Sequence, residues 1–281
     1  MKVIKSKKQI KKTVDGIKKS HNTIGFVPTM GFLHKGHMSL ISEAKKDCDK
    51  VVVSIFVNPI QFGRGEDFKA YPRKTDSDLL KCKKAGVDIV FLPEQKEMYS
   101  EGFQSYVNVP KLSNHLCGIS RPGHFAGVAT AVLKLLNIVK PEKAYFGEKD
   151  YQQLIIIKRM VSDLDLDVRI VNMPIIREED GLAMSSRNKY LGNIQRKKAN
   201  ILFRALEKGE NMVKKGEKNP EKIISVLKKM ILSEKTGKID YINICNPHTL
   251  ENLDKISSDV LIALAVKIGK ARLIDNRLVK R

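Results

Sequence analysis

Short apolar runs alternate with segments of helical periodicity between residues 23 and 171, and this alternation constrains the fold more than any other feature of the sequence. Each run carries few polar side chains, so it predicts a strand that is buried on both faces. Buried strands that lead into helices are typical of βαβ units in a parallel sheet. The predicted strands span 23–27, 50–57, 88–92, 144–146 and 168–171, and the predicted helices span 36–45, 75–85, 125–139 and 151–164. The sequence therefore predicts an α/β domain over residues 1–174, with a mostly parallel sheet and helices on both faces.

A further helix is expected near the start of the chain. Ser6 and Gln9 have the spacing of a capping box. The residues that follow place Ile10, Val14 and Ile17 on one helical face. We therefore expect a capped amphipathic helix before the first strand of the alternating pattern.

Beyond residue 174 the pattern changes, because apolar runs follow a pair of amphipathic segments instead of alternating with helices. The predicted helices there span 195–215 and 220–233, and the predicted strands span 238–245, 260–268 and 272–279. Runs of strands after runs of helices are typical of α+β organisation. We expect a smaller C-terminal α+β domain over residues 175–281, with an antiparallel sheet and a hinge near residues 172–178.

The formal net charge of +21 raises the question of a nucleic-acid partner. Most of the excess falls in residues 1–20, 196–238 and 267–281, which carry net charges of +7, +8 and +5. These cations are mostly lysines at helical spacing, without the interleaved aromatic side chains of nucleic-acid-binding segments. We interpret the charge as solvated surface, and nucleic acid is the less favoured partner.

Composition places the chain among ordinary globular proteins. Of its 281 residues 42% are hydrophobic, and no run is long enough to cross a bilayer. The Lys-rich start lacks the apolar centre of a signal peptide. We therefore expect a cytoplasmic protein without a membrane partner. The cysteines form no CxxC pair, which favours buried, unreactive thiols over a metal site at Cys48, Cys82, Cys117 and Cys245.

Two histidines, His34 and His37, lie three residues apart where a predicted strand passes into a helix. Pro28, Gly31 and Gly36 break the pattern between the two elements. The first turn of a helix has unpaired N–H groups and the positive end of the helix dipole, both of which attract anions. Imidazole N–H groups add further donors. The sequence His34–His37 therefore indicates a phosphate site, and the alternative is a chance occurrence of the motif with ordinary surface histidines.

Polar side chains also follow the strongest predicted strand. Asn58 and Gln61 each offer an acceptor and a donor, which suits a small substrate that has hydroxyl and carboxylate groups. The alternative is that Asn58 only begins a turn before Pro59. Asp76 and Asp78 could reach Mg²⁺ through water, but we interpret both as acidic residues in the first turn of the following helix.

Three further segments combine glycine with polar or charged residues at predicted element ends. Arg121–His124 leads into a helix, but it lacks the lysine that a phosphate-binding P-loop needs at the position of His124. Gly147–Gln153 joins a strand to a helix and includes Lys149, which can neutralise phosphate charge. Asp180–Asn188 offers consecutive hydroxyl groups and a guanidinium. For the last two segments, helix capping is the alternative interpretation.

Together these blocks, in their order and spacing, resemble the pantothenate synthetase (pantoate–β-alanine ligase) family of HxGH nucleotidyltransferases. The resemblance covers residues 24–195, and beyond them only the general layout is similar. It implies a Rossmann-like fold and an ATP-dependent ligase of pantothenate and coenzyme A biosynthesis. In that reaction the carboxylate of pantoate attacks the α-phosphorus of ATP and releases pyrophosphate. The amine of β-alanine then displaces AMP from the pantoyl adenylate.

The resemblance also implies roles for individual residues. Catalytic roles are implied for His37, as the best candidate proton donor, and for His34, Lys149 and Arg187. ATP contacts are implied for Met30, Gly31, Phe32, Leu33, His34, Lys35, Gly36, His37, Gly147, Glu148, Lys149, Asp150, Ile176, Met184, Ser185, Ser186 and Arg187. Substrate contacts are implied for Gln61, Gln153, Asn58 and His124. Mg²⁺ is expected to accompany ATP, with phosphate and water oxygens as its ligands. The smaller domain is expected to close over the ATP site, and the protein to be a homodimer.

Two alternatives remain open at this point. One is another HxGH nucleotidyltransferase, which would release a nucleotide-linked product and would not consume β-alanine. It leaves the segments around Gln61 and Gln153 unexplained. The other is an RNA-binding module related to class I synthetases, which the net charge favours.

Overall fold

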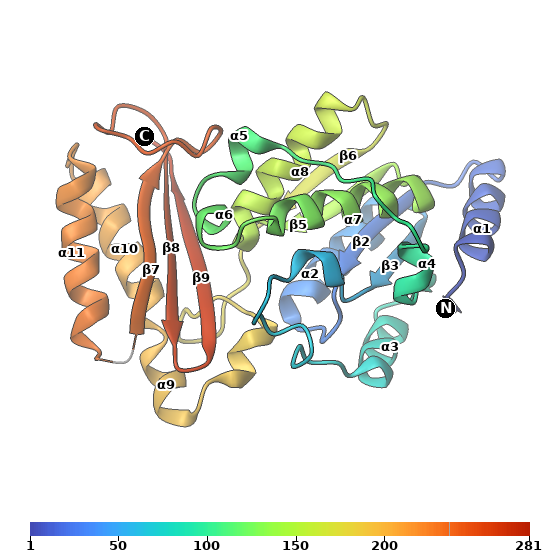
Figure 1. Ribbon diagram of the computed structural model, residues 1–281, viewed down its shortest axis with the longest axis horizontal. Coiled ribbons are helices and arrows are strands. Elements are labelled where there is room, and N and C mark those ends of the chain that lie inside the picture. Colours follow the sequence, from blue (N-terminus) through green and yellow to red (C-terminus); the bar gives the residue numbers. More distant parts are fainter. Residues whose placement is uncertain (236) are drawn as a thin grey trace. The chain divides into compact units, whose positions relative to one another are not determined.

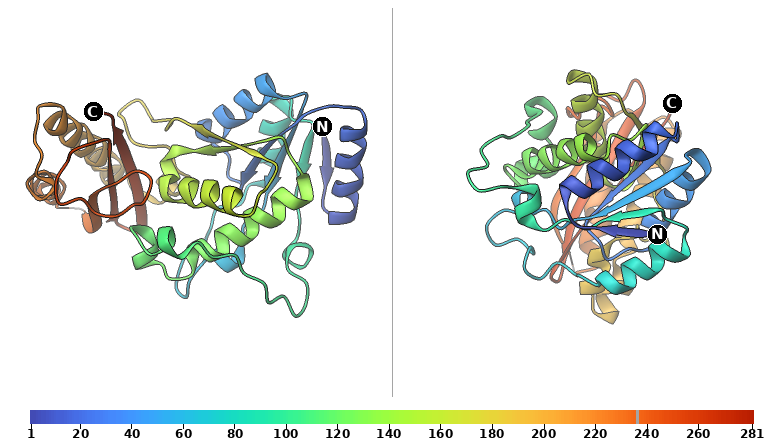
Figure 2. Two further views of the ribbon diagram at one scale, coloured as in Figure 1. Left: turned by 90° about the horizontal axis from the view of Figure 1, so that it is seen from above. Right: turned by 90° about the vertical axis from the view of Figure 1, so that its right-hand side faces the viewer.

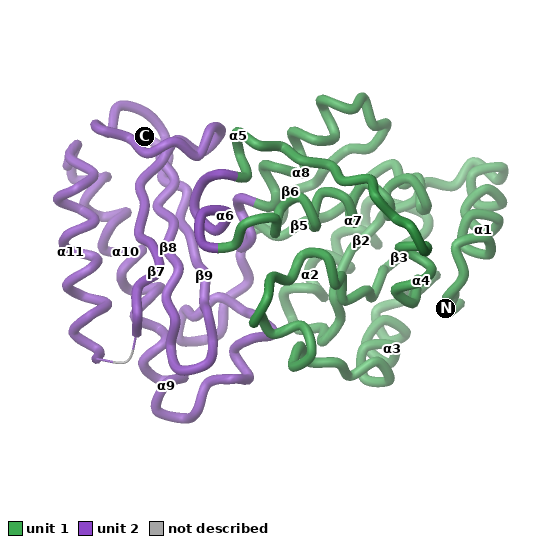
Figure 3. Tube along the Cα trace, viewed as in Figure 1, with its two compact units in different colours: residues 1–113, 121–148, 153–174 green, residues 114–120, 149–152, 175–281 purple. Residues whose placement is uncertain are grey.

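The computed structural model describes residues 1–235 and 237–281, which form two compact units (Figure 3). Unit 1 comprises residues 1–113, 121–148 and 153–174. Unit 2 comprises residues 114–120, 149–152 and 175–281. The chain therefore passes between the units several times before residue 175, which the simple change of pattern in the sequence does not predict.

A parallel sheet forms the centre of unit 1, with the strand order β1-β4-β3-β2-β5-β6 (Figure 1). Its strands are β1 (Lys2–Ile4), β2 (Ile24–Thr29), β3 (Lys50–Ile55), β4 (Ile89–Phe91), β5 (Lys143–Gly147) and β6 (Arg169–Met173). The parallel pairing confirms the predicted sheet. The sequence pattern does not predict β1, because three residues are too few to show a period.

Helices cover both faces of this sheet, as predicted. Helix α2 packs against β2, β3 and β5, whereas α7 packs against β2 and α1 on the opposite face (Figure 2). The longer helices are α1 (Lys7–Lys19), α2 (Lys35–Asp47), α3 (Thr75–Lys84), α7 (His124–Val139) and α8 (Tyr151–Asp163). Shorter helical turns are η1 (Pro59–Gln61), α4 (Gln95–Met98), α5 (Pro110–Ser113) and η2 (Glu148–Asp150).

The predicted capping box at the start of α1 is wrong in its chemistry. Ser6 has the backbone conformation of an N-cap, but its hydroxyl caps no helix N–H of the described chain. Instead, the Lys7 N–H donates to Glu97 Oε2 at 2.8 Å. A carboxylate distant in sequence therefore satisfies the helix end, and the local pattern of Ser6 and Gln9 cannot show this.

One hydrophobic core of unit 1 lies between β2, β3 and α2. Val27, Ile41 and Val53 are fully buried there. All four cysteines are buried and free, which agrees with the prediction of buried thiols.

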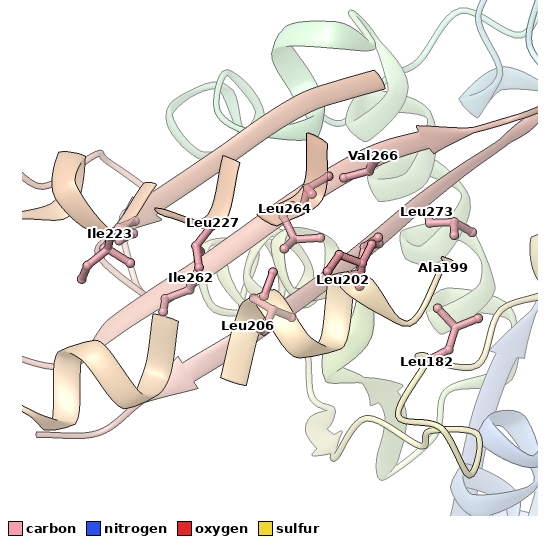
Figure 4. Close-up of a cluster of buried hydrophobic side chains, with 14 of the residues drawn as sticks. Leu182, Ala199, Leu202, Leu206, Ile223, Leu227, Ile262, Leu264, Val266 and Leu273 are labelled. Carbon is pink, nitrogen blue, oxygen red and sulfur yellow. The ribbon is translucent and has the colours of Figure 1, made fainter. Parts of the chain in front are cut away.

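Unit 2 contains the antiparallel sheet β7-β8-β9, again as predicted. Its strands are β7 (Gly237–Cys245), β8 (Val260–Ile268) and β9 (Ala271–Val279). Its helices are α6 (Cys117–Ser120), η3 (Ser186–Tyr190), α9 (Asn193–Lys198), α10 (Ile201–Lys214) and α11 (Pro220–Ser233). Figure 4 shows the core between the sheet and α10 and α11, where Leu206, Leu227 and Ile262 meet. In the two ranges that the structure covers, no helix is both long and apolar enough to cross a membrane.

The single helix predicted at 195–215 is wrong, because the structure ends α9 at Lys198 and begins α10 at Ile201. Ala199, Ile201 and Leu202 are all buried. In one continuous helix the second of these side chains would point away from the first. The break lets all three pack into the core, so tertiary packing overrides the local helical pattern.

Candidate active site

The loops that carry the predicted histidines and amides leave the same edge of the unit 1 sheet. Strands β3, β2 and β5 are adjacent and parallel, so their carboxyl ends at Ile55, Thr29 and Gly147 point in one direction. His34 follows β2 and Asn58 follows β3. This confirms the expectation that these segments lie at the carboxyl edge, which is where ligands bind in open α/β sheets.

A buried carboxylate holds the loop between β2 and α2. Gly31 and Phe32 have φ angles of +82° and +52°, in the left-handed region that phenylalanine rarely adopts. Asp78, which is 1% exposed, accepts the Phe32 N–H at 2.7 Å and the Leu33 N–H at 2.8 Å. Lys81 Nζ donates to the Leu33 carbonyl at 2.6 Å. Helix α3 therefore fixes the unusual backbone path that leads to the histidines.

His34 and His37 form a reciprocal cap at the start of α2. The Gly36 N–H donates to His34 Nδ1, and the His34 N–H donates to His37 Nδ1, each at 3.2 Å. The two rings lie with their centroids 4.1 Å apart. Because each Nδ1 accepts a hydrogen bond, the proton of each neutral ring is on Nε2. The fold therefore sets both imidazoles as Nε2–H donors beside the positive end of a helix dipole.

A network of amides lies beyond β3. Asn58 Nδ2 donates to Gln61 Oε1 at 2.9 Å and to the Gly127 carbonyl at 3.1 Å. Asn58 Oδ1 accepts the Tyr99 hydroxyl at 2.7 Å. Gln61 Nε2 points to Met30 Sδ at 3.2 Å, so the second amide lies beside the loop that leads to the histidines. Asn58 is 2% exposed and bonded through both ends of its amide. This geometry favours a supporting role for Asn58 over direct substrate contact.

His124 begins α7 and contacts the same turn as the amides. Its Nδ1 lies 2.7 Å from the Gln61 carbonyl, and its Nε2 lies 2.9 Å from Arg121 Nη1. Arg121 also forms a bidentate ion pair with Glu66, at 2.7 and 2.6 Å. The structure therefore brings together Met30–His37, Asn58, Gln61 and His124 within unit 1.

Unit 2 carries the other group of predicted ATP contacts. The Met184 N–H donates to the Ile176 carbonyl at 3.0 Å, so these two residues lie on adjacent backbone segments. Ser185 Oγ accepts the Arg187 N–H at 3.2 Å and caps η3, as the helix-cap alternative expects. Ser186 is buried. The sequence Ser185–Arg187 is thus a formed turn, and its contact with a nucleotide stays a prediction.

The predicted residues after β5 divide between the units. In unit 2, Lys149 Nζ lies 3.7 Å from Asp150 Oδ2, and Asn276 Nδ2 donates to the Lys149 carbonyl at 2.9 Å. In unit 1, Glu148 accepts a hydrogen bond from Asn172, and Gln153 is half-buried on α8.

The space beside Gly147 is open. A Cβ atom built there would meet no described atom within 4 Å, which leaves room for a ligand against the backbone.

The sequence interpretation missed several residues that shape the site. The sequence pattern indicates an acidic residue in the first turn of a helix at Asp78, whereas the structure shows that this carboxylate holds the histidine loop. Tyr99 and Glu66 reach the site from distant loops. An acidic residue in a first helical turn is ordinary, so the local pattern offers no signal for any of these contacts. Only the meeting of separate segments reveals them.

Gly127 provides a test of how closely α7 approaches the amide network. A Cβ atom at this position would lie 2.3 Å from the Ile60 carbonyl oxygen and 2.8 Å from the Gln61 Cα. We expect Gly127→Ala to lower the free energy of unfolding by about 1–3 kcal/mol, because backbone atoms must move. The control is Gly16→Ala in α1, where the added Cβ meets no described atom within 4 Å. Gly16→Ala is expected to raise the free energy of unfolding by about 0.5–1 kcal/mol. Urea unfolding of both variants checks the prediction, and an unchanged Gly127→Ala protein would contradict it.

Among residues 1–235 and 237–281, no group of three or more His, Cys, Asp or Glu side chains could hold a metal ion.

Comparison with known proteins identifies related chains. Residues 2–278 match the family model for pantoate-beta-alanine ligase. The chain is 54% identical over 272 residues to pantothenate synthetase from Caldicellulosiruptor saccharolyticus, covering 97% of each chain. The crystal structure of pantothenate synthetase from Thermus thermophilus is 41% identical, with a TM-score of 0.95 over 100% of both chains. The pantoate-beta-alanine ligase from Francisella tularensis, solved in complex with beta-gamma ATP and beta-alanine, is 38% identical. Its TM-score is 0.83 over 99% of this chain and 97% of its own.

Proposed function

The chain belongs to the pantoate-beta-alanine ligase family, and we propose that it makes pantothenate through a pantoyl adenylate at the carboxyl edge of the unit 1 sheet. The reaction joins the carboxylate of pantoate to the amine of β-alanine and cleaves ATP to AMP and pyrophosphate. The observation that carries the assignment to this edge is the pair of Nε2–H imidazoles at the start of α2. The family match over residues 2–278 favours the pantoate ligase over another HxGH nucleotidyltransferase. The absence of a nucleic-acid partner stays a prediction.

In the first step, the loop Met30–His37 is proposed to bind the phosphates of ATP. The pantoate carboxylate attacks the α-phosphorus, and the bond from that phosphorus to the bridging oxygen of pyrophosphate breaks. Negative charge develops on pyrophosphate as it leaves. His34 and His37 offer Nε2–H hydrogen bonds to this charge. His37 is the proposed proton donor, and a full proton transfer requires its ring to be protonated at Nδ1 as well, with loss of the contact from the His34 N–H. No enzyme nucleophile is needed, because pantoate itself supplies the attacking oxygen.

Pantoate is proposed to bind through Gln61 and Gln153, with Gln61 also close to β-alanine. Asn58 and His124 are then supporting residues that hold Gln61 from its side chain and its carbonyl. In the second step, the amine of β-alanine attacks the adenylate carbonyl. The carbon–oxygen bond to AMP breaks, and the amine loses a proton as the amide forms.

The remaining ATP contacts are proposed for Gly147, Glu148, Asp150, Ile176 and the segment Met184–Arg187. Lys149 and Arg187 would neutralise phosphate charge, and Ser185 and Ser186 would donate hydroxyl hydrogen bonds. Mg²⁺ would enter with ATP, held by phosphate and water oxygens. We also propose that residues 1–174 and 175–281 act as two domains, and that the second closes over ATP. Small-angle scattering with and without ATP and pantoate tests that closure.

The decisive assay measures AMP, pyrophosphate and pantothenate in the same samples, with each substrate omitted in turn. We expect repeated turnover, with AMP, pyrophosphate and pantothenate formed in equal amounts, only when ATP, pantoate and β-alanine are all present. Without β-alanine, pyrophosphate should appear in an amount limited by the enzyme concentration, because the adenylate stays bound. Formation of a nucleotide-linked product without use of β-alanine would contradict the proposal.

Gln61→Ala is expected to raise the KM for pantoate about 10- to 100-fold, while the KM for ATP changes little. The lost hydrogen bond involves a charged substrate, and such bonds contribute about 1.5–3 kcal/mol. Gln104→Ala, at an exposed position, is the matched control. Steady-state kinetics with each substrate varied checks this, and an unchanged pantoate dependence would remove Gln61 from the site.

We further propose a cytoplasmic homodimer without nucleic acid. Light scattering of the purified protein tests the dimer. Binding of added RNA that weakens as the salt concentration rises, measured by a gel mobility shift, would contradict the proposed absence of a nucleic-acid partner.

A further inference from the structure

Arg121, Glu66 and His124 form a chain of contacts that ends on the backbone of Gln61. Arg121 Nε and Nη2 donate to the two Glu66 carboxylate oxygens at 2.7 and 2.6 Å. Arg121 Nη1 lies 2.9 Å from His124 Nε2, and His124 Nδ1 lies 2.7 Å from the Gln61 carbonyl. Arg121 Nη2 also reaches that carbonyl directly, at a longer distance of 3.5 Å. The side chains of Arg121 and Glu66 are only 15% and 24% exposed. A bidentate pair shielded in this way holds the guanidinium in one orientation.

The chemistry of these groups fixes the proton on the imidazole. A guanidinium has only donors, so His124 Nε2 must accept from Arg121 with its lone pair. The ring proton is then on Nδ1, and Nδ1–H donates to the Gln61 carbonyl. A protonated His124 ring would point its Nε2–H at the Arg121 guanidinium, so that two donors of the same charge would face each other. The contacts therefore favour the neutral Nδ1–H tautomer, opposite to the tautomer of His34 and His37.

Two charged groups face His124: the Arg121 guanidinium contacts the ring and disfavours its protonation, whereas the Glu66 carboxylate acts in the opposite direction. Arg121 faces the ring from the turn before α7, and Glu66 faces it from the loop after η1. Burial raises the pKa of the Glu66 carboxyl, but the hydrogen bonds and the charge of Arg121 outweigh this effect and leave the pKa below its usual value. Glu66 thus stays ionised at neutral pH and keeps Arg121 aligned.

We propose that Arg121 is a positioning residue that holds His124 as the neutral Nδ1–H tautomer, and that this tautomer holds the Gln61 turn in place for pantoate. The role of Gln61 rests on the proposed function, whereas the tautomer of His124 does not. Glu66 aligns Arg121 within the same chain of contacts. The competing explanation is that the ion pair only fastens the loop containing Glu66 and that the state of His124 is irrelevant.

Three variants separate these explanations. Glu66→Gln removes the ion pair but leaves Arg121 to donate to His124. Arg121→Met combined with Glu66→Gln removes the donor without leaving an unpaired carboxylate. His124→Asn keeps an N–H donor near the position of Nδ1 and needs no tautomer. Arg159→Gln, in an exposed pair on α8, is the control.

The first readout is the imidazole ¹⁵N NMR spectrum of the substrate-free protein across pH 5–9, which needs no activity. His124 is assigned from the His124→Asn spectrum. We expect the Nδ1–H signature in the wild type and in Glu66→Gln at neutral pH. In the Arg121→Met/Glu66→Gln variant we expect this signature to give way to a mixture of the two neutral tautomers. An Nε2–H tautomer or a protonated ring in the wild type at pH 7 would overturn the proposal.

The second readout is the KM for pantoate. We expect it to rise about tenfold in the Arg121→Met/Glu66→Gln variant, and less than threefold in Glu66→Gln. Adding His124→Asn to the Arg121→Met/Glu66→Gln variant should bring the KM for pantoate most of the way back to the wild-type value, because the side-chain N–H of asparagine does not depend on Arg121. If the KM for pantoate rises equally in Glu66→Gln and in the Arg121→Met/Glu66→Gln variant, and His124→Asn does not lower it again, then the ion pair only fastens the loop. That result would overturn the proposal that Arg121 acts through His124. An inactive wild type with the expected NMR signature would contradict the proposed function alone.

Discussion

His37→Asn is expected to lower the rate of pyrophosphate release by about 10²- to 10⁴-fold, with the fold retained. Asparagine can place Oδ1 where His37 has Nδ1, so it can still accept the His34 N–H that completes the cap of α2. It has no atom at the position of Nε2. The variant therefore removes the proposed donor to the leaving pyrophosphate while it keeps the local hydrogen bond.

Matched variants distinguish chemistry from structure at this position. Glutamine can reach the position of Nε2 with an N–H, so His37→Gln should retain more activity than His37→Asn. His37→Ala loses both contacts and should also unfold at lower urea concentration. Single-turnover release of pyrophosphate measures the effect, together with circular dichroism of each variant. Near wild-type release by His37→Asn would remove His37 from the chemical step.

Asp78→Asn is expected to weaken ATP binding and stability together. The Asp78 carboxylate accepts two successive N–H groups, from Phe32 and Leu33. An amide has a single oxygen, so its NH₂ group would face one of these donors. A buried donor without a partner costs about 1–3 kcal/mol. Because the bond from Phe32 to Asp78 helps to hold Phe32 in its left-handed conformation, the loop should relax and the KM for ATP should rise at least about tenfold.

Asp76→Asn is the control for this change, since Asp76 is exposed in the same turn of α3. It should leave both the KM for ATP and the urea midpoint close to the wild-type values. Kinetics with ATP varied and urea unfolding are measured on both variants. If Asp78→Asn lowers stability but leaves the KM for ATP unchanged, then the loop does not bind the nucleotide in the conformation described.

The sequence predicts the alternating part of the fold well, because burial on both faces leaves a strong local signal. The strand at 260–268 and the helix at 220–233 have the bounds that the pattern gives. The pattern fails where a distant group or the core decides the outcome. Glu97 satisfies the start of α1, and the buried Ala199 and Ile201 break a predicted helix.

The candidate site also has features that the sequence predicts and features that depend on contacts between distant segments. The histidine pair, the amides and the glycine-rich turns are visible as residue types at the ends of predicted elements. The parallel register then brings the segments after β2 and β3 to one edge. The roles of Asn58 and His124 become specific only with their hydrogen-bond partners.

The sequence by itself predicted the α/β architecture, because periodicity is a local property of the chain. The order and spacing of its motifs indicated the family and the residues that are proposed to contact phosphate and substrate. Only the tertiary structure brought a backbone N–H to Nδ1 of His34 and of His37, and placed the ring of His124 between Arg121 and the Gln61 carbonyl. It also showed that Asp78 holds the histidine loop. A hydrogen bond depends on the position of two atoms within about 3 Å, and packing between distant segments sets that position.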